Sequence, residues 1–236
     1  MAIAIILAGG KGTRMGNVSE PKQFIDVYGK PILIHTLELF DIHPEIEHIA
    51  VVCVDEWHDE LRRWIRKYDL NKIKWIVNSG SSRQQSTYNA LIAIENDVLK
   101  NDIVVIHDSA RPLVTHRIIT DNIKAAKQYG AVDTVIPTSD TIVNSVDAKK
   151  ISNIPNRNHL FLGQTPQSFE YQKIRSAHDR AFRNQINNAS DDCQLLLNQG
   201  DQVFLVSGEK LNFKITTMDD LLLLKSVVKL GKTERI

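Results

Sequence analysis

The stretch Ala2–Leu7 (AIAIIL) runs directly into Ala8-Gly9-Gly10-Lys11-Gly12-Thr13-Arg14-Met15-Gly16. An uninterrupted apolar run rich in Ile is typical of a central parallel strand that is buried on both faces. The glycines after it let the backbone approach a ligand closely and direct several N–H groups to one place. Such an arrangement suits phosphate oxygens. The sequence therefore predicts a buried strand followed by a phosphate-binding loop.

Two common phosphate-binding patterns do not fit this loop. A Walker A loop requires Ser or Thr after Gly-Lys, but Gly12 follows Gly10-Lys11. The dinucleotide fingerprint is excluded because its third glycine is displaced to Gly16. Two cations, Arg14 and Lys22, follow in the sequence, and an Arg fork with a Lys point charge suits phosphate binding. The alternative is a plain strand-to-helix turn with solvated cations.

Further apolar runs alternate with segments of helical periodicity along the chain. Strands are expected at Ile49–Val54, Ile73–Val77, Ile103–Ile106, Val132–Ile136 and Val203–Val206. Helices are expected at Pro31–Phe40, Glu56–Tyr68, Gln84–Glu95, His116–Tyr129, Glu170–Arg183, Asp191–Asn198 and Thr217–Leu230. This alternation predicts an α/β fold, with a Rossmann-like open, mostly parallel sheet and helices on both faces. Ligands of such sheets bind beyond the carboxyl ends of the strands.

The alternation breaks after Pro137. Thr138–Val146 and Lys149–Ile154 look extended on either side of Asp147-Ala148. They predict a protruding β-hairpin arm over about residues 138–156, and projecting arms often build dimers. Because no linker, repeat or low-complexity tract appears, residues 1–236 are expected to form a single domain with this arm.

Composition limits the class of protein. The chain has 236 residues, 42% of them hydrophobic and 24% charged, with a formal net charge of +1. These values are ordinary for a globular protein and lack the basic excess of proteins that coat nucleic acid. Cys53 and Cys193 show no metal-ligand spacing. No apolar run approaches membrane-spanning length, so a cytoplasmic protein with no nucleic-acid or membrane partner is expected.

Five ordered blocks of the sequence carry a family resemblance. They are Leu7–Gly16 continued by Pro21–Phe24 (PKQF), Gly80–Ser86 (GSSRQQS), His107–Pro112 (HDSARP), Gln164–Phe169 (QTPQSF) and Asn212–Thr217 (NFKITT). Together they resemble the cytidylyltransferase family that includes methylerythritol-phosphate and ribitol-phosphate cytidylyltransferases. The resemblance implies a Mg²⁺-dependent enzyme that joins CMP from CTP to a polyol phosphate, and a homodimer built through the arm.

The resemblance also implies roles for particular residues. Catalytic roles fall on Arg14, Lys22, Arg157 and Lys214, and the Mg²⁺ ligand is Asp108. The nucleotide would be bound by Leu7, Ala8, Gly9, Gly10, Gly80, Ser81, Ser82, Arg83, Gln84, Gln85, Ser86 and Ser109. The acceptor would be bound by Arg111, Asp140, Thr141, Arg157 and Lys214. Without the resemblance, Gly80–Ser86 is equally an ordinary helix N-cap, Asp108 a turn cap, Arg157 an exposed loop cation and Lys214 a solvent-facing side chain.

The choice of acceptor rests on small departures between branches of the family. The methylerythritol branch is expected to carry an acidic residue just before the Asn of the closing block, where this chain has Leu211. Gly208-Glu209 and Asp140-Thr141-Ile142-Val143 resemble the ribitol branch. The resemblance therefore favours D-ribitol 5-phosphate, giving CDP-ribitol for teichoic acid or a related surface polymer. The alternatives are 2-C-methyl-D-erythritol 4-phosphate, used in isoprenoid synthesis, and a non-catalytic nucleotide-binding module.

Overall fold

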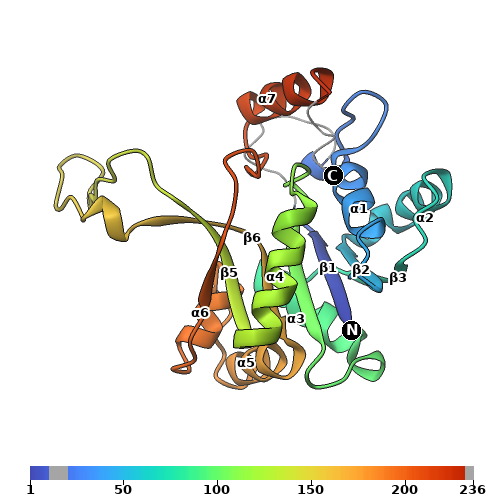
Figure 1. Cartoon of the computed structure of the whole chain (residues 1–236), viewed down its shortest axis with the longest axis horizontal. Helices are drawn as coiled ribbons and strands as arrows, with labels where there is room; N and C mark the ends of the chain where they lie inside the picture. Colours follow the sequence, from blue (N-terminus) through green and yellow to red (C-terminus); the bar gives the residue numbers. More distant parts are fainter. Residues whose placement is uncertain (11–20, 232–236) are drawn as a thin grey trace.

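The computed structural model describes residues 1–10 and 21–231 of the chain (Figure 1). Within them, seven strands form one sheet in the order β3-β2-β1-β4-β6-β5-β7. The strands are β1 (Ala2–Ala8), β2 (His48–Cys53), β3 (Ile73–Asn78), β4 (Ile103–Asp108), β5 (Ala131–Pro137), β6 (Phe161–Glu170) and β7 (Phe204–Ser207). Strand β6 is antiparallel to both of its neighbours, and the remaining pairs are parallel. The mostly parallel sheet is confirmed.

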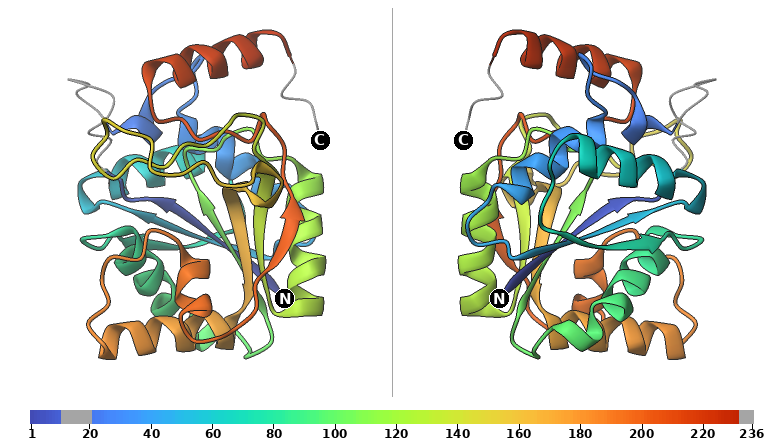
Figure 2. Two further views of the ribbon diagram at one scale, coloured as in Figure 1. Left: turned by 90° about the vertical axis from the view of Figure 1, so that its left-hand side faces the viewer. Right: turned by 90° about the vertical axis from the view of Figure 1, so that its right-hand side faces the viewer.

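Helices cover both faces of this sheet (Figure 2). They are α1 (Ile32–Asp41), α2 (His58–Lys67), α3 (Arg83–Ala93), α4 (His116–Tyr129), α5 (Tyr171–Arg183) and α6 (Asp192–Leu197). Helix α7 (Met218–Lys229) lies apart from these faces and packs in a separate cluster with Val27, Ile32 and Ala110 (Figure 1). Alternate residues of β1 enter different cores: Ala4 and Ile6 pack with α1, α2 and α4, whereas Ile3 and Ile5 pack with α3, α5 and α6. The apolar run of β1 is therefore explained by burial on both faces.

Helix α4 shows how local sequence sets the bounds of an element. The Thr115 side chain caps its first turn by accepting the N–H of Ile118. Gly130 ends the helix with φ +83°, a left-handed conformation that favours glycine. Both ends lie where the sequence predicts them. At α6 the N-cap is Asp191, because its carboxylate accepts the N–H of Cys193.

Strand β6 is the element that periodicity does not predict. Its central side chains are polar yet buried, so apolar residues do not alternate along it. Their partners come from distant parts of the chain: Thr165 faces His107, Gln167 donates to Asp133 and Asp191, and Ser168 donates to Asn122. A buried polar strand depends on such partners, because a buried polar group without a hydrogen bond costs free energy.

The arm leaves the body after β5 and returns into β6 (Figure 1). Its two halves meet in one isolated bridge, between Asn144 and Asn153, in place of the continuous ladder expected of a β-hairpin. Backbone N–H groups of Lys149 and Lys150 donate to the Asp147 carboxylate and form the tip. Among the described residues, no helix is both long enough and apolar enough to cross a membrane.

Candidate active site

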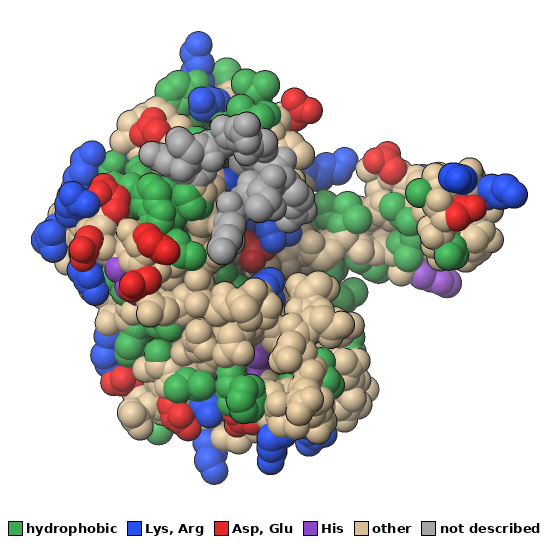
Figure 3. All heavy atoms as spheres, turned by 180° about the vertical axis from the view of Figure 1, so that it is seen from behind, with side chains coloured by type: hydrophobic (Ala, Val, Ile, Leu, Met, Phe, Trp, Pro, Cys, Tyr) green, Lys and Arg blue, Asp and Glu red, His purple; other side chains and the backbone are tan. Residues whose placement is uncertain are grey.

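A cavity of about 750 Å³ opens beyond the carboxyl ends of β1 and β4. Its wall is formed by the end of β1, the short helix Lys22–Phe24, the residue after β2, the N-terminus of α3 with the residues before it, the end of β4 with the residues after it, and the segment before α7. The described residues that line it are Leu7, Gly9, Gly10, Lys22, Gln23, Val54, Ser79, Gly80, Ser81, Ser82, Arg83, Ser86, Asp108, Ser109, Ala110, Lys214 and Thr216. Figure 3 shows basic and acidic side chains close together near the middle of the face seen from behind. The cavity therefore lies where ligands of open α/β sheets bind.

The start of the glycine loop is held by a neighbouring side chain. Gln23 is buried and donates its amide to the carbonyls of Ala8, at 2.6 Å, and Gly10, at 3.0 Å. A Cβ added at Gly9 would overlap the Ser79 side chain, so only glycine fits this passage. Of the predicted nucleotide-binding residues here, Leu7, Gly9 and Gly10 line the cavity and Ala8 is buried. Arg14 lies outside the described residues, so its role stays a prediction.

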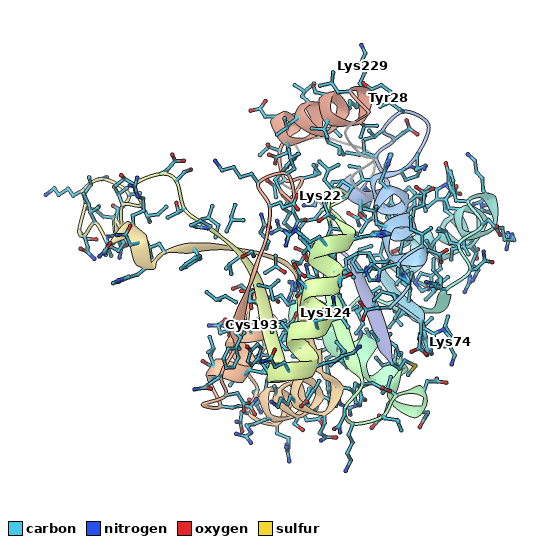
Figure 4. All side chains as sticks on the ribbon, in the orientation of Figure 1. Lys22, Tyr28, Lys74, Lys124, Cys193 and Lys229 are labelled. Atoms are coloured by element: carbon cyan, nitrogen blue, oxygen red, sulfur yellow. The ribbon has the colours of Figure 1, made fainter. Side chains whose placement is uncertain are left out.

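Lys22 stands at the beginning of the short helix Lys22–Phe24 and faces the cavity. Its ammonium donates to the Ile215 carbonyl at 2.7 Å, which places it below α7 (Figure 4). Phe24 anchors the same turn, because its ring stacks on Trp57 with centroids 4.1 Å apart. A buried aromatic anchor beside a cation on the cavity wall reduces the freedom of that cation.

The block Gly80–Ser86 at the N-terminus of α3 was interpreted either as a helix N-cap or as a nucleotide-binding segment, and the structure is compatible with both. Ser82 is a true N-cap, because its Oγ accepts the N–H of Gln85 at 3.1 Å. Gly80 donates its N–H to Ser86 Oγ at 3.0 Å, and a Cβ at Gly80 would overlap Gln85. Gly80, Ser81, Ser82, Arg83 and Ser86 nevertheless line the cavity. The N–H dipoles at a helix N-terminus favour anionic ligands.

Gln84 and Gln85 are placed elsewhere. They line a separate hollow of about 260 Å³ together with Tyr88 and Phe182. The Gln84 amide donates to the Ile186 carbonyl and accepts the N–H of Ala189, so it fixes the segment before α6. The structure therefore does not bring these two predicted nucleotide-binding side chains to the main cavity.

Asp108 ends β4 and is surrounded by three cations. Its Oδ2 lies 2.7 Å from Lys214 Nζ and 3.9 Å from Arg111 Nε, and its Oδ1 lies 3.6 Å from Arg83 Nε. Burial by itself would raise the pKa of this carboxyl, but Lys214, Arg83 and Arg111 hold it well below its usual range. Asp108 is therefore ionised at any physiological pH. Lys214, expected in a strand-like stretch, lies in a segment without strand pairing.

Arg111 and His107 pack behind Asp108. Arg111 is 9% exposed and donates to the Asn212 carbonyl at 2.7 Å. It was predicted to bind the acceptor, but it lies beside Asp108 and does not line the described cavity wall. His107 is fully buried between Thr165 and the Arg111 carbonyl, and burial lowers its pKa to about 4. A neutral, packed His107 supports the site without supplying charge.

The remaining predicted residues lie on the arm. Asp140, Thr141 and Arg157 are exposed, and Arg157 donates to the Ser139 carbonyl at 3.1 Å. None of the three lines the cavity of its own chain among the described residues. The structure thus gathers Asp108, Lys214, Arg83 and Lys22 in one place and keeps the arm residues apart from them.

Asp108 is the sole carboxylate among the described residues that line the cavity, and those residues hold no cluster of three or more His, Cys, Asp or Glu side chains. This donor set fits Mg²⁺, which commonly takes one or two carboxylates and completes its shell with phosphate oxygens and water. It does not fit a metal that needs several protein ligands, such as structural Zn²⁺.

Five cavity residues were not predicted as site residues. Gln23, Ala110 and Thr216 fall within quoted blocks, Ser79 immediately precedes one, and Val54 ends the predicted strand Ile49–Val54. Asp192 forms an ion pair with Arg83 at 2.6 Å. The sequence could not predict this pair, because 109 positions separate the two residues.

Comparison with known proteins is consistent with this geometry. The family model for 2-C-methyl-D-erythritol 4-phosphate cytidylyltransferase matches residues 2–229. A 4-diphosphocytidyl-2C-methyl-D-erythritol synthase from Anaerococcus prevotii superposes with a TM-score of 0.83 at 28% identity, covering 97% of this chain and 96% of that one. The 2-C-methyl-D-erythritol 4-phosphate cytidylyltransferase of Francisella tularensis gives 0.80 at 29% identity, covering 95% and 98%. That of Thermus thermophilus gives 0.78 at 29%, covering 97% and 100%. The chain therefore belongs to the 2-C-methyl-D-erythritol 4-phosphate cytidylyltransferase family and is a nucleotidyltransferase enzyme.

Proposed function

We propose that this cytidylyltransferase transfers CMP from CTP to the phosphate group of a small polyol phosphate. The observation that carries the proposal is the ionised Asp108, set between Lys214 and Arg83 in a cavity that begins at the glycine loop. A carboxylate for a cation, two basic side chains and a loop that admits phosphate are the components that nucleotidyl transfer requires.

The reaction proceeds as an in-line displacement. An oxygen of the acceptor phosphate forms a new bond to the α-phosphorus of CTP. The bond from that phosphorus to the oxygen bridging to the β-phosphate breaks, and pyrophosphate leaves with the electron pair. Because the attacking phosphate is already anionic, no base is needed to deprotonate it. Lys22 and Lys214 offset the charge that develops on the phosphorus oxygens, and Arg14 is predicted to share this role.

Mg²⁺ is the divalent cation that the donor set supports, and Asp108 would hold it. When bound, the ion neutralises triphosphate charge and helps to orient the leaving pyrophosphate. The proposed nucleotide-binding residues are those named from the sequence. Support is strongest for Leu7, Gly9, Gly10, Gly80, Ser81, Ser82, Arg83, Ser86 and Ser109, because they line the cavity.

The acceptor site is proposed to be completed by a second chain. The arm that carries Asp140, Thr141 and Arg157 extends away from the body of the chain (Figure 1), and none of the three lines the described cavity wall of its own chain. The arm also exposes apolar side chains, with Val146 92% and Ile151 62% exposed. Exposed apolar surface of this kind is suited to association. In a homodimer, Arg157 of one chain would reach the acceptor phosphate held by Lys214 of the other.

Two acceptors are candidates. The matched family and the relatives are named for a methylerythritol product or substrate. They therefore favour 2-C-methyl-D-erythritol 4-phosphate, and with it isoprenoid synthesis, over the ribitol acceptor and wall polymer that the sequence blocks favoured. D-Ribitol 5-phosphate remains the second candidate on one observation. Leu211, which stands where the methylerythritol branch is expected to carry an acidic residue, packs against the apolar cluster of α7.

A direct comparison of the two acceptors tests the proposal. Pyrophosphate release is measured with CTP and Mg²⁺ against increasing concentrations of each acceptor, and kcat/KM is compared. We expect release with at least one, and a preference of about tenfold or more for 2-C-methyl-D-erythritol 4-phosphate. A preference for D-ribitol 5-phosphate would select the second candidate. If the chain binds CTP but releases pyrophosphate with neither acceptor, the non-catalytic nucleotide-binding module would be supported instead.

A further inference from the structure

Arg83 is held between two carboxylates of different character. Its Nη1 lies 2.6 Å from Asp192 Oδ2, whereas its Nε lies 3.6 Å from Asp108 Oδ1. Asp108 is on the cavity wall and Asp192 is behind it, 1% exposed. The closer contact is therefore the one that faces away from the ligand.

Asp192 is itself fixed by a second buried residue. Its other oxygen, Oδ1, lies 3.1 Å from Nε2 of His178, which is also 1% exposed. The His178 ring stacks on Tyr88 with an interplanar angle of 5°, and the Tyr88 hydroxyl donates to Asp179. Burial would raise the pKa of Asp192, but Arg83 and the bond from His178 lower it. The carboxylate is thus charged and has little freedom to turn.

We propose that Asp192, oriented by His178, is a positioning residue that fixes the Arg83 guanidinium on the cavity wall and holds it back from Asp108. This inference rests on the proposed function, in which Arg83 contacts the nucleotide and Asp108 holds Mg²⁺. A buried charged acceptor fixes an Arg fork in one orientation. Without Asp192, Arg83 would turn fully to Asp108 and pair with the carboxylate that Mg²⁺ needs. It would also lose its orientation toward the triphosphate.

The arrangement differs from an ordinary surface ion pair in what its loss would do. Lys74 and Asp97 also form an ion pair, but on the surface and beyond the far end of α3 from Arg83. Replacing Asp97 removes an acid of the same kind without touching the cavity. Asp97→Asn is therefore the matched control for Asp192→Asn.

The test is a double-mutant cycle on CTP binding. The dissociation constant of CTP with Mg²⁺ is measured by titration calorimetry for the wild type, Asp192→Asn, Arg83→Gln and the double variant, and kcat/KM for CTP is measured in parallel. We expect Asp192→Asn to weaken binding about tenfold, Arg83→Gln to weaken it at least as much, and the double variant to match Arg83→Gln. His178→Phe keeps the ring that stacks on Tyr88 but removes the bond to Asp192, and is expected to weaken binding in the same direction. It reports on the proposal if Asp192→Asn does not fold.

The outcomes separate this inference from the proposed function. Wild-type affinity in Asp192→Asn or His178→Phe would overturn it. So would losses that multiply in the double variant, since independent sites are additive in free energy and a purely structural Asp192 would act independently of Arg83. If the wild type binds CTP but releases no pyrophosphate, the proposed function fails while the binding cycle still decides the role of Asp192. If the wild type does not bind CTP, both are refuted.

Discussion

Replacing Lys214 by Met is the most informative single change at the site. Lys214 Nζ contacts Asp108 Oδ2 at 2.7 Å, and its side chain is 33% exposed. Met keeps the length and the apolar stem but removes the charge. Asp108 would retain Arg83 at 3.6 Å and Arg111 at 3.9 Å, so it stays ionised and the carboxyl end of β4 keeps its partners.

The expected cost to folding is much smaller than the expected cost to catalysis. A partly exposed ion pair contributes about 1 kcal/mol to the free energy of unfolding, which lowers the Tm of a chain of this size by about 2–4 °C. Losing one preorganised donor of positive charge at the reacting phosphate lowers kcat by about 10²–10³-fold, or roughly 2.7–4 kcal/mol. Activity should therefore fall far more than stability.

The assay pairs pyrophosphate release at saturating CTP, Mg²⁺ and acceptor with thermal unfolding of the same preparation. Lys74→Met is the control, because it removes Lys from a surface ion pair of similar exposure, 41%, outside the cavity. It should lower Tm slightly and leave kcat unchanged. A kcat within threefold of wild type for Lys214→Met, or a loss matched by unfolding at the assay temperature, would refute this reasoning.

Three other changes test separate parts of the account. Lys22→Ala removes the cavity cation that donates to Ile215 and should lower turnover at least about a hundredfold; wild-type turnover would exclude Lys22 from the site. Arg157→Ala on the arm should raise the KM for the acceptor while leaving the KM for CTP unchanged, and the opposite pattern would contradict the proposed acceptor role. Burial, and then the Asp191 carboxylate, raise the pKa of Asp133 to about 7. Between about pH 4 and pH 7 the folded state keeps a proton on Asp133 that the unfolded state releases. The free energy of unfolding therefore decreases as the pH rises through this range. The Tm of the wild type should fall more steeply from pH 5 to pH 8 than that of Asp133→Asn, and equal slopes would disprove the effect.

The sequence predicted the elements whose pattern is local. The apolar run of β1 and the helical periodicity of α4 are patterns of neighbouring residues, and both elements were predicted close to their observed bounds. Strand β6 could not be predicted in this way, because its buried side chains are polar. Gln167 and Ser168 hydrogen-bond to residues from other segments, which are Asp133, Asp191 and Asn122. Single-strand periodicity contains no information about such partners. The regular ladder expected in the arm is also missing from the described structure, apart from the bridge at Asn144.

The same division applies to the site. Asp108 was predicted because it follows a strand at the edge where ligands bind. Its ion pair with Lys214 joins residues 106 positions apart (214 − 108), and only the resemblance suggested that they act together. Arg111 shows the limit of that reasoning. Its block predicted a residue that binds the acceptor, but did not predict that Arg111 is buried and bonded to the Asn212 carbonyl. Burial depends on the packing of distant segments and not on the block itself.

The central claim is that the acceptor phosphate attacks CTP directly in this cavity. Its most direct test is the reaction with an acceptor whose phosphate oxygens carry ¹⁸O, followed by ³¹P nuclear magnetic resonance. The account predicts ¹⁸O at the oxygen that bridges the two phosphorus atoms of the CDP-polyol product, and unlabelled pyrophosphate in equal amount. A product whose bridging oxygen comes from CTP, label in the pyrophosphate, or no product with either acceptor would contradict it.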